Sequence, residues 1–295
     1  MRITSKAVSI VAFSFLTVVI SPARGAITFL DHFNSSSSFD IILANGEFAG
    51  GDSTATLSNS PTTDTGFFPG STPANLAYKG GSTSPSYAEF IGSDGNIDFT
   101  SPTTGGITVG AWVKFFGATN PVGRILTLGA PDLDDDALML DYGNSNTDIP
   151  RAYFRDGASV QTLTTGSAVN LSNWVYFAVS VDLSASQMKL YLYDATGAAL
   201  ASSPLSTSIP VSSWNLDNPL ATGHRVRIGG AAAPGSTLWM DELSIDSEVL
   251  SQAAISARVA SMVAGNQLQV PEPAAGFSLF VAGLATIRRQ RRTVR

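Results

Sequence analysis

The stretch Trp174–Tyr193, WVYFAVSVDLSASQMKLYLY, decides the fold class of this chain. Apolar residues alternate on both sides of the polar segment Asp182–Gln187. The members are Val175, Phe177, Val179 and Val181, then Met188, Leu190 and Leu192. A period of two places each set on one face of a β-strand. Because the connecting segment is short and polar, the pattern predicts an antiparallel hairpin with one face on a core. The following Asp194–Gly197 predicts a turn in which Gly197 takes a positive φ.

The composition agrees with an all-β domain. The chain has 295 residues, with 27 glycines and 15 prolines, which suits one β-sandwich with many turns. It contains no cysteine, and this excludes a disulfide framework and thiol chemistry. The formal net charge is −6, and the basic residues gather near the two ends. An acidic body repels phosphate backbones, so the sequence predicts no binding to nucleic acid.

The N-terminus has the pattern of an export signal. Arg2 and Lys6 precede the apolar run Ala7–Ile20, and small residues follow at Ala23 and Gly25. This order predicts a secretory signal peptide over residues 1–25. The alternative is a membrane anchor, for which the run is shorter than the roughly 20 apolar residues that a spanning helix needs.

Further strands are predicted where apolar residues alternate or cluster between turn residues. They are Ile27–Phe33, Tyr87–Gly92, Ile97–Phe99, Ile107–Phe115, Arg124–Leu128, Ala137–Tyr142, Arg151–Arg155, Arg225–Gly229 and Leu238–Ile245. The Ser-, Thr-, Gly- and Pro-rich segment Asp52–Lys79 predicts short strands and long loops. Ser251 predicts the N-cap of a helix that runs to about Val263, with Gly265 just past its end.

Five segments together resemble a known superfamily. In order they are YAEFIGSDGNIDF (87–99), ITVGAWVKF (107–115), WVYFAVSVD with MKLYLYDATG (174–197), RVRIGG (225–230) and LWMDELSIDSEVLSQAAI (238–255). Their order and spacing resemble the laminin-G-like, concanavalin A-like lectin/glucanase superfamily. The resemblance implies an all-β jelly-roll sandwich of two antiparallel sheets, which we assign to residues 26–265.

The C-terminal residues 266–295 resemble the PEP-CTERM sorting signal of Gram-negative bacteria. The resemblance rests on a Pro-Glu-Pro motif, an apolar segment (274–287) and an arginine cluster: Val270, Pro271, Glu272 and Pro273, then Arg288, Arg289, Arg291 and Arg292. It implies a transmembrane sorting helix that inserts transiently in the inner membrane with its arginines in the cytoplasm. It also implies cleavage near the motif by an exosortase, and delivery to the cell surface or extracellular matrix. The alternative is a C-terminal core helix with a basic tail.

The densest acidic cluster predicts a Ca²⁺ site. Its members are Asp132, Asp134, Asp135 and Asp136, with Asp141 nearby. Carboxylates this close repel one another unless water or a cation separates them. The alternative is a solvated loop. The alternating Asp94, Asn96 and Asp98 fit the strand-turn-strand of the resembled superfamily better than a calcium loop.

Two carboxylates that face each other could perform glycoside hydrolysis. Asp241 shares the parity of Trp239, Leu243 and Ile245, so we expect it to be buried and bonded to backbone N–H groups or an arginine. Glu242 and Asp246 are expected on the opposite, solvated face. The resembled glucanases carry an acidic signature along one strand that this chain lacks, so the sequence predicts no catalytic site. His32 and His224 do not define a Ser-His-Asp arrangement.

Trp214 is the best candidate for a sugar-stacking aromatic. It lies in the polar loop SSWNLDN, with Asn215 and Asp217 beside it, whereas Trp112, Trp174 and Trp239 lie in or beside predicted strands. An aromatic face can stack on a sugar ring while amides and carboxylates bind its hydroxyls. The alternative is that Trp214 closes the sandwich and is buried.

These patterns together predict an exported, exosortase-sorted protein with a non-catalytic glycan-binding or adhesive β-sandwich. Its predicted partner is an extracellular polysaccharide. Two alternatives remain: a polysaccharide-degrading glycoside hydrolase on the same fold, and a purely structural matrix protein.

Overall fold

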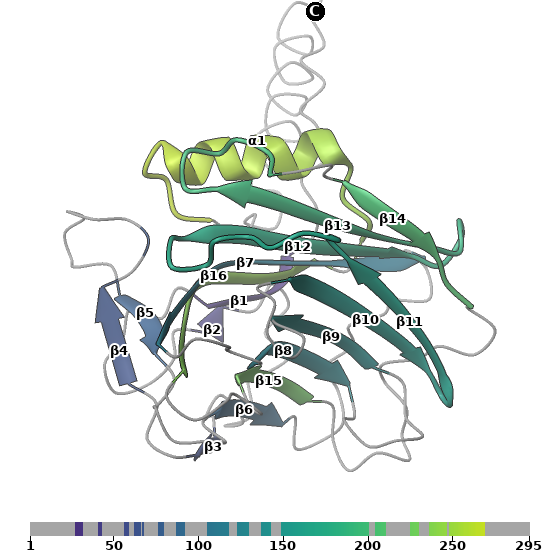
Figure 1. The fold of residues 1–295 in the computed structure, drawn as a ribbon, viewed down its shortest axis with the longest axis horizontal. Helices are drawn as coiled ribbons and strands as arrows, with labels where there is room; N and C mark the ends of the chain where they lie inside the picture. The colour runs from purple at the N-terminus through teal and green to yellow at the C-terminus, as the bar shows by residue number, and fades with distance from the viewer. Residues whose placement is uncertain are drawn as a thin grey trace, which may run out of the picture.

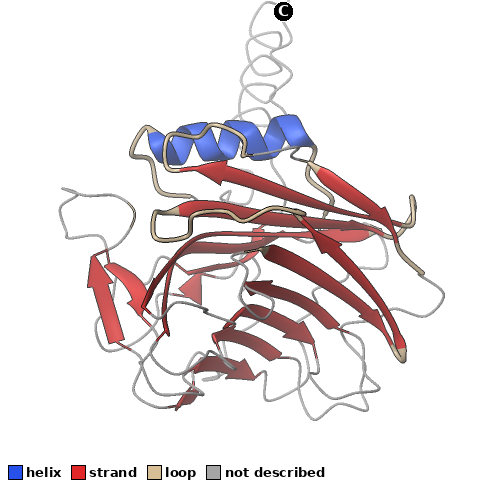
Figure 2. Ribbon diagram, viewed as in Figure 1, coloured by secondary structure: helices blue, strands red, loops and turns tan. Residues whose placement is uncertain are grey.

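The computed structural model describes residues 27–31, 41–42, 56–58, 62–65, 67, 76–79, 87–91, 105–117, 123–129, 137–142, 149–200, 204–210, 225–229, 236–246 and 248–268. These residues form two packed β-sheets with a helix on one side (Figures 1 and 2). The expected signal peptide and sorting helix lie outside the described residues.

One sheet has nine described strands, and every pairing in it is antiparallel. Its order is β14 (Leu205–Ser208), β13 (Gln187–Asp194), β12 (Val175–Asp182), β7 (Gly106–Gly117), β16 (Ser236–Asp246), β1 (Ile27–Asp31) and β2 (Ile41–Ile42). Off this path, β5 (Leu76–Lys79) pairs with β16 and with β4 (Thr62–Thr65).

The second sheet has seven described strands, also antiparallel throughout. Its order is β11 (Ser159–Thr164), β10 (Pro150–Asp156), β9 (Ala137–Tyr142), β8 (Gly123–Gly129), β15 (Arg225–Gly229), β6 (Tyr87–Ile91) and β3 (Thr56–Ser58). Strands distant in sequence therefore become neighbours, as β15 does between β8 and β6.

The predicted hairpin forms at one side of the larger sheet. β12 and β13 pair in register from Val175 opposite Asp194 to Asp182 opposite Gln187. Both alternating apolar sets point into the core between the sheets, where Phe177, Val179 and Leu190 are fully buried. The period-two prediction for this stretch is confirmed.

Aspartates close the turns at both ends of β13. Asp182 Oδ1 accepts hydrogen bonds from Ser184 Oγ at 2.7 Å and Ala185 N at 2.8 Å. Asp194 Oδ1 accepts from Thr196 N at 2.8 Å, and Gly197 follows at φ +83°. The predicted turn and its positive φ are confirmed.

The helix α1 (Gln252–Val263) begins and ends as predicted. Ser251 Oγ accepts from Ala254 N at 3.2 Å. At the other end Gly265 takes φ +89°, and its N–H donates to the Met262 carbonyl, as in a Schellman C-cap. Figure 1 shows α1 over the outer face of the nine-stranded sheet, on the side away from the second sheet.

A second apolar cluster holds α1 against that sheet. The sheet contributes Trp112, Tyr176, Ala178, Tyr191 and Tyr193, and the helix contributes Ile255, Val259 and Met262. These are the strand residues of opposite parity to the main core. The nine-stranded sheet is therefore buried on both faces in this region, which explains why its strands are almost continuously apolar.

Most predicted strands are confirmed within a residue or two at each end, as for β9 and β15. The segment Asp52–Lys79 contains the short strands β3, β4 and β5. The predicted strand Ile97–Phe99 lies outside the described residues. Three strands were not predicted, β2, β11 and β14. β11 and β14 are edge strands rich in Ser and Thr, and in β11 only Leu163 is buried.

Candidate functional site

The outer face of the seven-stranded sheet carries a group of polar side chains. Along β10, Ala152 and Phe154 lie in the core, so Arg151, Tyr153 and Arg155 lie on the opposite face. Cross-strand pairing extends this surface, which we call the β10 face. Its members are Arg124, Thr127, Met139, Asp141, Arg151, Tyr153, Arg155, Thr162 and Arg227.

Strand register arranges the β10 face in rows across the strands. The central row is Arg227, Thr127, Met139, Tyr153 and Thr162. The row on one side is Arg124, Asp141 and Arg151. Arg155 lies on the other side of Tyr153, two residues along β10. Tyr153 and Met139 thus form an apolar floor between charged side chains.

A carboxylate links the two arginines of the side row. Asp141 Oδ1 pairs with Arg124 Nε, and Asp141 Oδ2 lies 3.7 Å from Arg151 Nη2. Burial raises the pKa of the Asp141 carboxyl above its usual value, and the charges of Arg124 and Arg151 oppose this rise without cancelling it. The sequence grouped Asp141 with the acidic loop, but the structure places it between two guanidinium groups.

Tyr153 is the aromatic centre of the β10 face. Its ring is half-buried, and the Arg151 guanidinium lies 5.0 Å from the ring centroid, within the range of a cation–π interaction. Burial raises the pKa of the Tyr153 phenol above its usual value. The protonated hydroxyl can both donate and accept a hydrogen bond. Arg151 Nε is buried and has no hydrogen-bond partner among the described residues.

This arrangement suits a ligand that has an apolar face and polar edges. A ring can stack on Tyr153, and guanidinium N–H groups and the exposed Thr162 hydroxyl can bind oxygens around its rim. Sequence reasoning missed the β10 face. The alternation of Arg151, Tyr153 and Arg155 in RAYFR was a visible signal, but it could not show which side chains of β8, β9 and β15 lie beside it.

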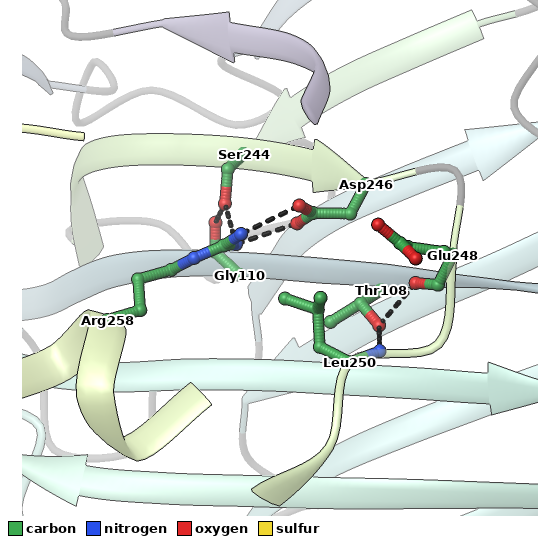
Figure 3. Close-up of polar contacts among 7 residues, drawn as sticks. All are labelled: Thr108, Gly110, Ser244, Asp246, Glu248, Leu250 and Arg258. Carbon is green, nitrogen blue, oxygen red and sulfur yellow. Dashed lines mark hydrogen bonds and ion pairs between the residues drawn. The ribbon is translucent and has the colours of Figure 1, made fainter. Parts of the chain in front are cut away.

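A second polar cluster lies between α1 and β16, and it is buried. Arg258 donates to both oxygens of Asp246 at 2.7 Å and to Ser244 Oγ at 3.2 Å (Figure 3). Burial tends to lower the pKa of Arg258, but the hydrogen bonds and charge of Asp246 raise it overall. The Tyr176 hydroxyl reaches the same cluster because Gly110 has no side chain. A Cβ there would lie 2.2 Å from that oxygen. This cluster fixes the helix and is closed to a large ligand.

Thr108 ties the chain before α1 to the same sheet. Its hydroxyl donates to the Glu248 carbonyl and accepts from Leu250 N, both at 2.8 Å (Figure 3). The segment between β16 and α1 is thereby held against β7.

Asp241 is buried and bonded to backbone N–H groups, as predicted. Its oxygens accept from Phe67 N at 2.8 Å and Glu242 N at 2.9 Å. The Phe67 ring stacks on Trp112, with centroids 3.8 Å apart and planes 9° apart. The predicted parity was wrong for part of the set, however, because Asp241 faces Trp112 on the outer side, whereas Leu243 and Ile245 lie in the main core.

The prediction that Glu242 and Asp246 form a solvated face is also wrong. Both are fully buried. The register of β16 shifts between Asp241 and Ser244, and Glu242 takes φ +52°, so a bulge interrupts the alternation. Glu242 Oε2 accepts from Leu268 N at 2.8 Å, while Asp246 pairs with Arg258. These acids stabilise the fold.

The other predicted sites lie outside the described residues. They are the glycan site of Trp214, Asn215 and Asp217, the calcium loop of Asp132, Asp134, Asp135 and Asp136, the sorting signal from Val270 onward, and His32 and His224. Within the described ranges, no three His, Asp or Glu side chains gather as metal ligands do. No described helix has both the length and the apolar character needed to span a membrane.

The three other tryptophans pack against described neighbours. Trp112 is fully buried. Trp174 meets the Phe67 ring edge-on at 6.2 Å. Trp239 lies 4.4 Å from Lys114 Nζ in a cation–π contact. The expectation that strand aromatics belong to the core is confirmed for Trp112.

Comparison with known proteins agrees with this architecture. A family model described as the concanavalin A-like lectin/glucanases superfamily matches residues 91–256. The binding domain of botulinum neurotoxin DC in complex with SialylT has a TM-score of 0.55 and 10% sequence identity, covering 80% of this chain and 52% of that chain. The botulinum neurotoxin serotype C1 binding domain has a TM-score of 0.55 and 12% identity over the same shares. The chain thus spans about half of each, and at these identities the likeness concerns the fold. No curated protein sequence matches significantly.

Proposed function

The chain belongs to the concanavalin A-like lectin/glucanases superfamily, and we propose that it acts as an exported, non-catalytic glycan-binding protein. The predicted superfamily and its two-sheet sandwich are both confirmed. Members of one fold serve many functions, so the function has to be argued from a site. The proposed ligand lies on the β10 face, over Tyr153.

The observation that carries the proposal is the half-buried Tyr153 ring with an arginine on each side of it along β10. Sugar-binding sites combine an aromatic ring, which stacks on the apolar side of the sugar, with convergent hydrogen-bonding groups. Arg151, Arg155 and Thr162 supply donors around this ring. Their strands belong to a sheet packed on the main core, so the groups are held on a rigid support.

The proposed setting is the outside of a Gram-negative cell. The export signal predicted over residues 1–25 and the sorting signal predicted over residues 266–295 support it. In this proposal an exosortase processes the C-terminal segment after transient insertion in the inner membrane, and the sandwich stays at the cell surface or in the matrix with an extracellular polysaccharide. Ca²⁺ at the Asp132–Asp136 loop remains part of the proposal.

A glycan array tests the β10 face, with the wild-type protein and Tyr153→Ala. Tyr153→Ala should lose binding and keep the wild-type melting temperature, because the ring is only half-buried. Val263→Ala is the matched control, since Val263 is an exposed apolar residue on α1, which covers the other sheet. Loss in Trp214→Ala with retention in Tyr153→Ala would move the site to the predicted loop. A blank array for the wild type would favour the purely structural matrix protein.

A polysaccharide hydrolase on the same fold is the second candidate. The observation that favours it is the raised pKa of Asp141, since a buried carboxyl can serve as a general acid. Its two arginine partners argue for an electrostatic role instead. Release of reducing ends by the wild type that is abolished in Asp141→Asn would establish the hydrolase. We expect no release from either protein.

A further inference from the structure

The charge of the β10 face differs in sign from that of the whole chain. Its described side chains include four arginines, Arg124, Arg151, Arg155 and Arg227, and one carboxylate, Asp141, which lies between Arg124 and Arg151. The whole chain has a formal net charge of −6. Local potential at a surface depends on the charges nearest to it, so the β10 face is an electropositive surface on an acidic protein.

The arginines also surround the apolar floor. Arg151 and Arg155 lie on either side of Tyr153 along β10, each about 6.6 Å away at the rise of a strand. Arg227 stands three strands away from Tyr153, about 14 Å across the sheet. A surface of this extent is larger than one sugar ring and suits several units of a polymer.

Part of the donor capacity of Arg151 is unused by the fold. Arg151 meets Asp141 at 3.7 Å, which is longer than a hydrogen bond, and its buried Nε has no partner among the described residues. A guanidinium has five N–H donors in a planar fork that matches a carboxylate. An anionic group at the edge of a ring stacked on Tyr153 would meet this donor set.

We infer that the ligand of the β10 face is an acidic polysaccharide whose sugar units carry carboxylates, with the sugar ring on Tyr153 and the carboxylates on Arg151 and Arg155. The inference rests on the proposed glycan-binding function and adds the chemical class of the ligand. Nucleic acid is a polyanion as well, and the export signal predicted over residues 1–25 favours an extracellular polysaccharide over it.

The test uses pairs of polysaccharides that differ only in charge. The panel is polygalacturonate, alginate and hyaluronan, each beside its carboxyl-reduced, neutral counterpart, and binding is measured by isothermal titration and by depletion from solution. At least one acidic polymer should bind about tenfold more tightly than its neutral counterpart, the loss expected when a charge-assisted hydrogen bond is removed. Single-stranded RNA is included as a second polyanion.

Charge variants connect the preference to this surface. Arg155→Gln and Arg227→Gln should each reduce binding of the acidic polymer about tenfold, with little change for the neutral polymer. Lys189→Gln is the matched control, because this substitution also removes one positive charge, from β13 on the other sheet. Melting temperatures are recorded for every variant. If one of the two arginine variants is unstable, the binding data of the other variant test the inference.

Each outcome has a meaning. Equal affinity for acidic and neutral polymers, lost in Tyr153→Ala, would keep the glycan-binding function and overturn the acidic class. Failure of the wild type to bind any polymer in the panel would overturn both. An equal loss in Lys189→Gln, or equally tight binding of RNA, would reduce the effect to general electrostatic attraction and overturn the inference.

Discussion

Replacing Arg258 by methionine tests whether the buried ion pair fixes α1 on the sheet. Arg258→Met keeps an apolar side chain in place but leaves Asp246, which is fully buried, without its guanidinium partner. Breaking a buried pair in this way costs about 3–5 kcal/mol. For a domain of this size, that corresponds to a fall of about 6–20 °C in melting temperature.

Equilibrium unfolding in urea measures the free energy directly. The double variant Asp246→Asn with Arg258→Met removes both charges and should recover much of the loss, because the uncompensated buried charge disappears. Gln252→Met is the matched control, since Gln252 is exposed in the first turn of the same helix. A loss below about 1 kcal/mol for Arg258→Met, or a double variant no more stable than the single, would refute the reasoning.

Four further predictions follow from the sequence and the turns. Mass spectrometry of protein recovered outside the cell should find no residues after Pro273, and an intact Arg288–Arg295 would contradict processing by an exosortase. Millimolar Ca²⁺ should raise the melting temperature through the Asp132–Asp136 loop, because a ligand that binds only the folded state stabilises it. An identical melting temperature in EDTA would dismiss that site. If Trp214 is exposed, acrylamide should quench it and glycan should protect it, whereas a component that resists quenching would place it in the core. Hydrogen bonds from Thr196 lower the pKa of Asp194 below its usual 3.8 in the folded state. The ionised Asp194 carboxylate therefore stabilises the fold above its unfolded pKa of 3.8, and this stabilisation is lost as pH falls through the folded pKa. As the solution is acidified, the melting temperature should fall more steeply for the wild type than for Asp194→Asn.

Local patterns predicted the elements whose determinants lie close together in sequence. Alternation is sufficient for the hairpin of β12 and β13, because both faces of it meet apolar partners and the turn residues adjoin it. Ser251 and Gly265 mark the ends of α1 through hydrogen bonds that reach three to five residues. The polar edge strands β11 and β14 carry no such signal, because their backbone pairing needs little apolar burial.

The bulge in β16 shows why the acids were misplaced. No sequence pattern indicates that Glu242, a non-glycine residue, takes a positive φ. Uninterrupted alternation along β16 therefore assigned Asp241 and Leu243 to the same face. The β10 face depends on the same kind of information. Arg124, Asp141 and Arg151 become neighbours only through the register of three strands.

The two attachments of the C-terminal segment to β16 have a mechanical consequence. Leu268 N is held by Glu242 and Arg258 is held by Asp246, so both attachments lead to one strand. β16 is an interior strand, paired with β7 on one side and β1 on the other. Tension applied to the chain beyond Leu268 is therefore transmitted to the middle of the sheet, where two ladders of hydrogen bonds share the load. If the protein is tethered by this end, a pulling force acts on the interior strand β16 before α1 can separate from the sheet.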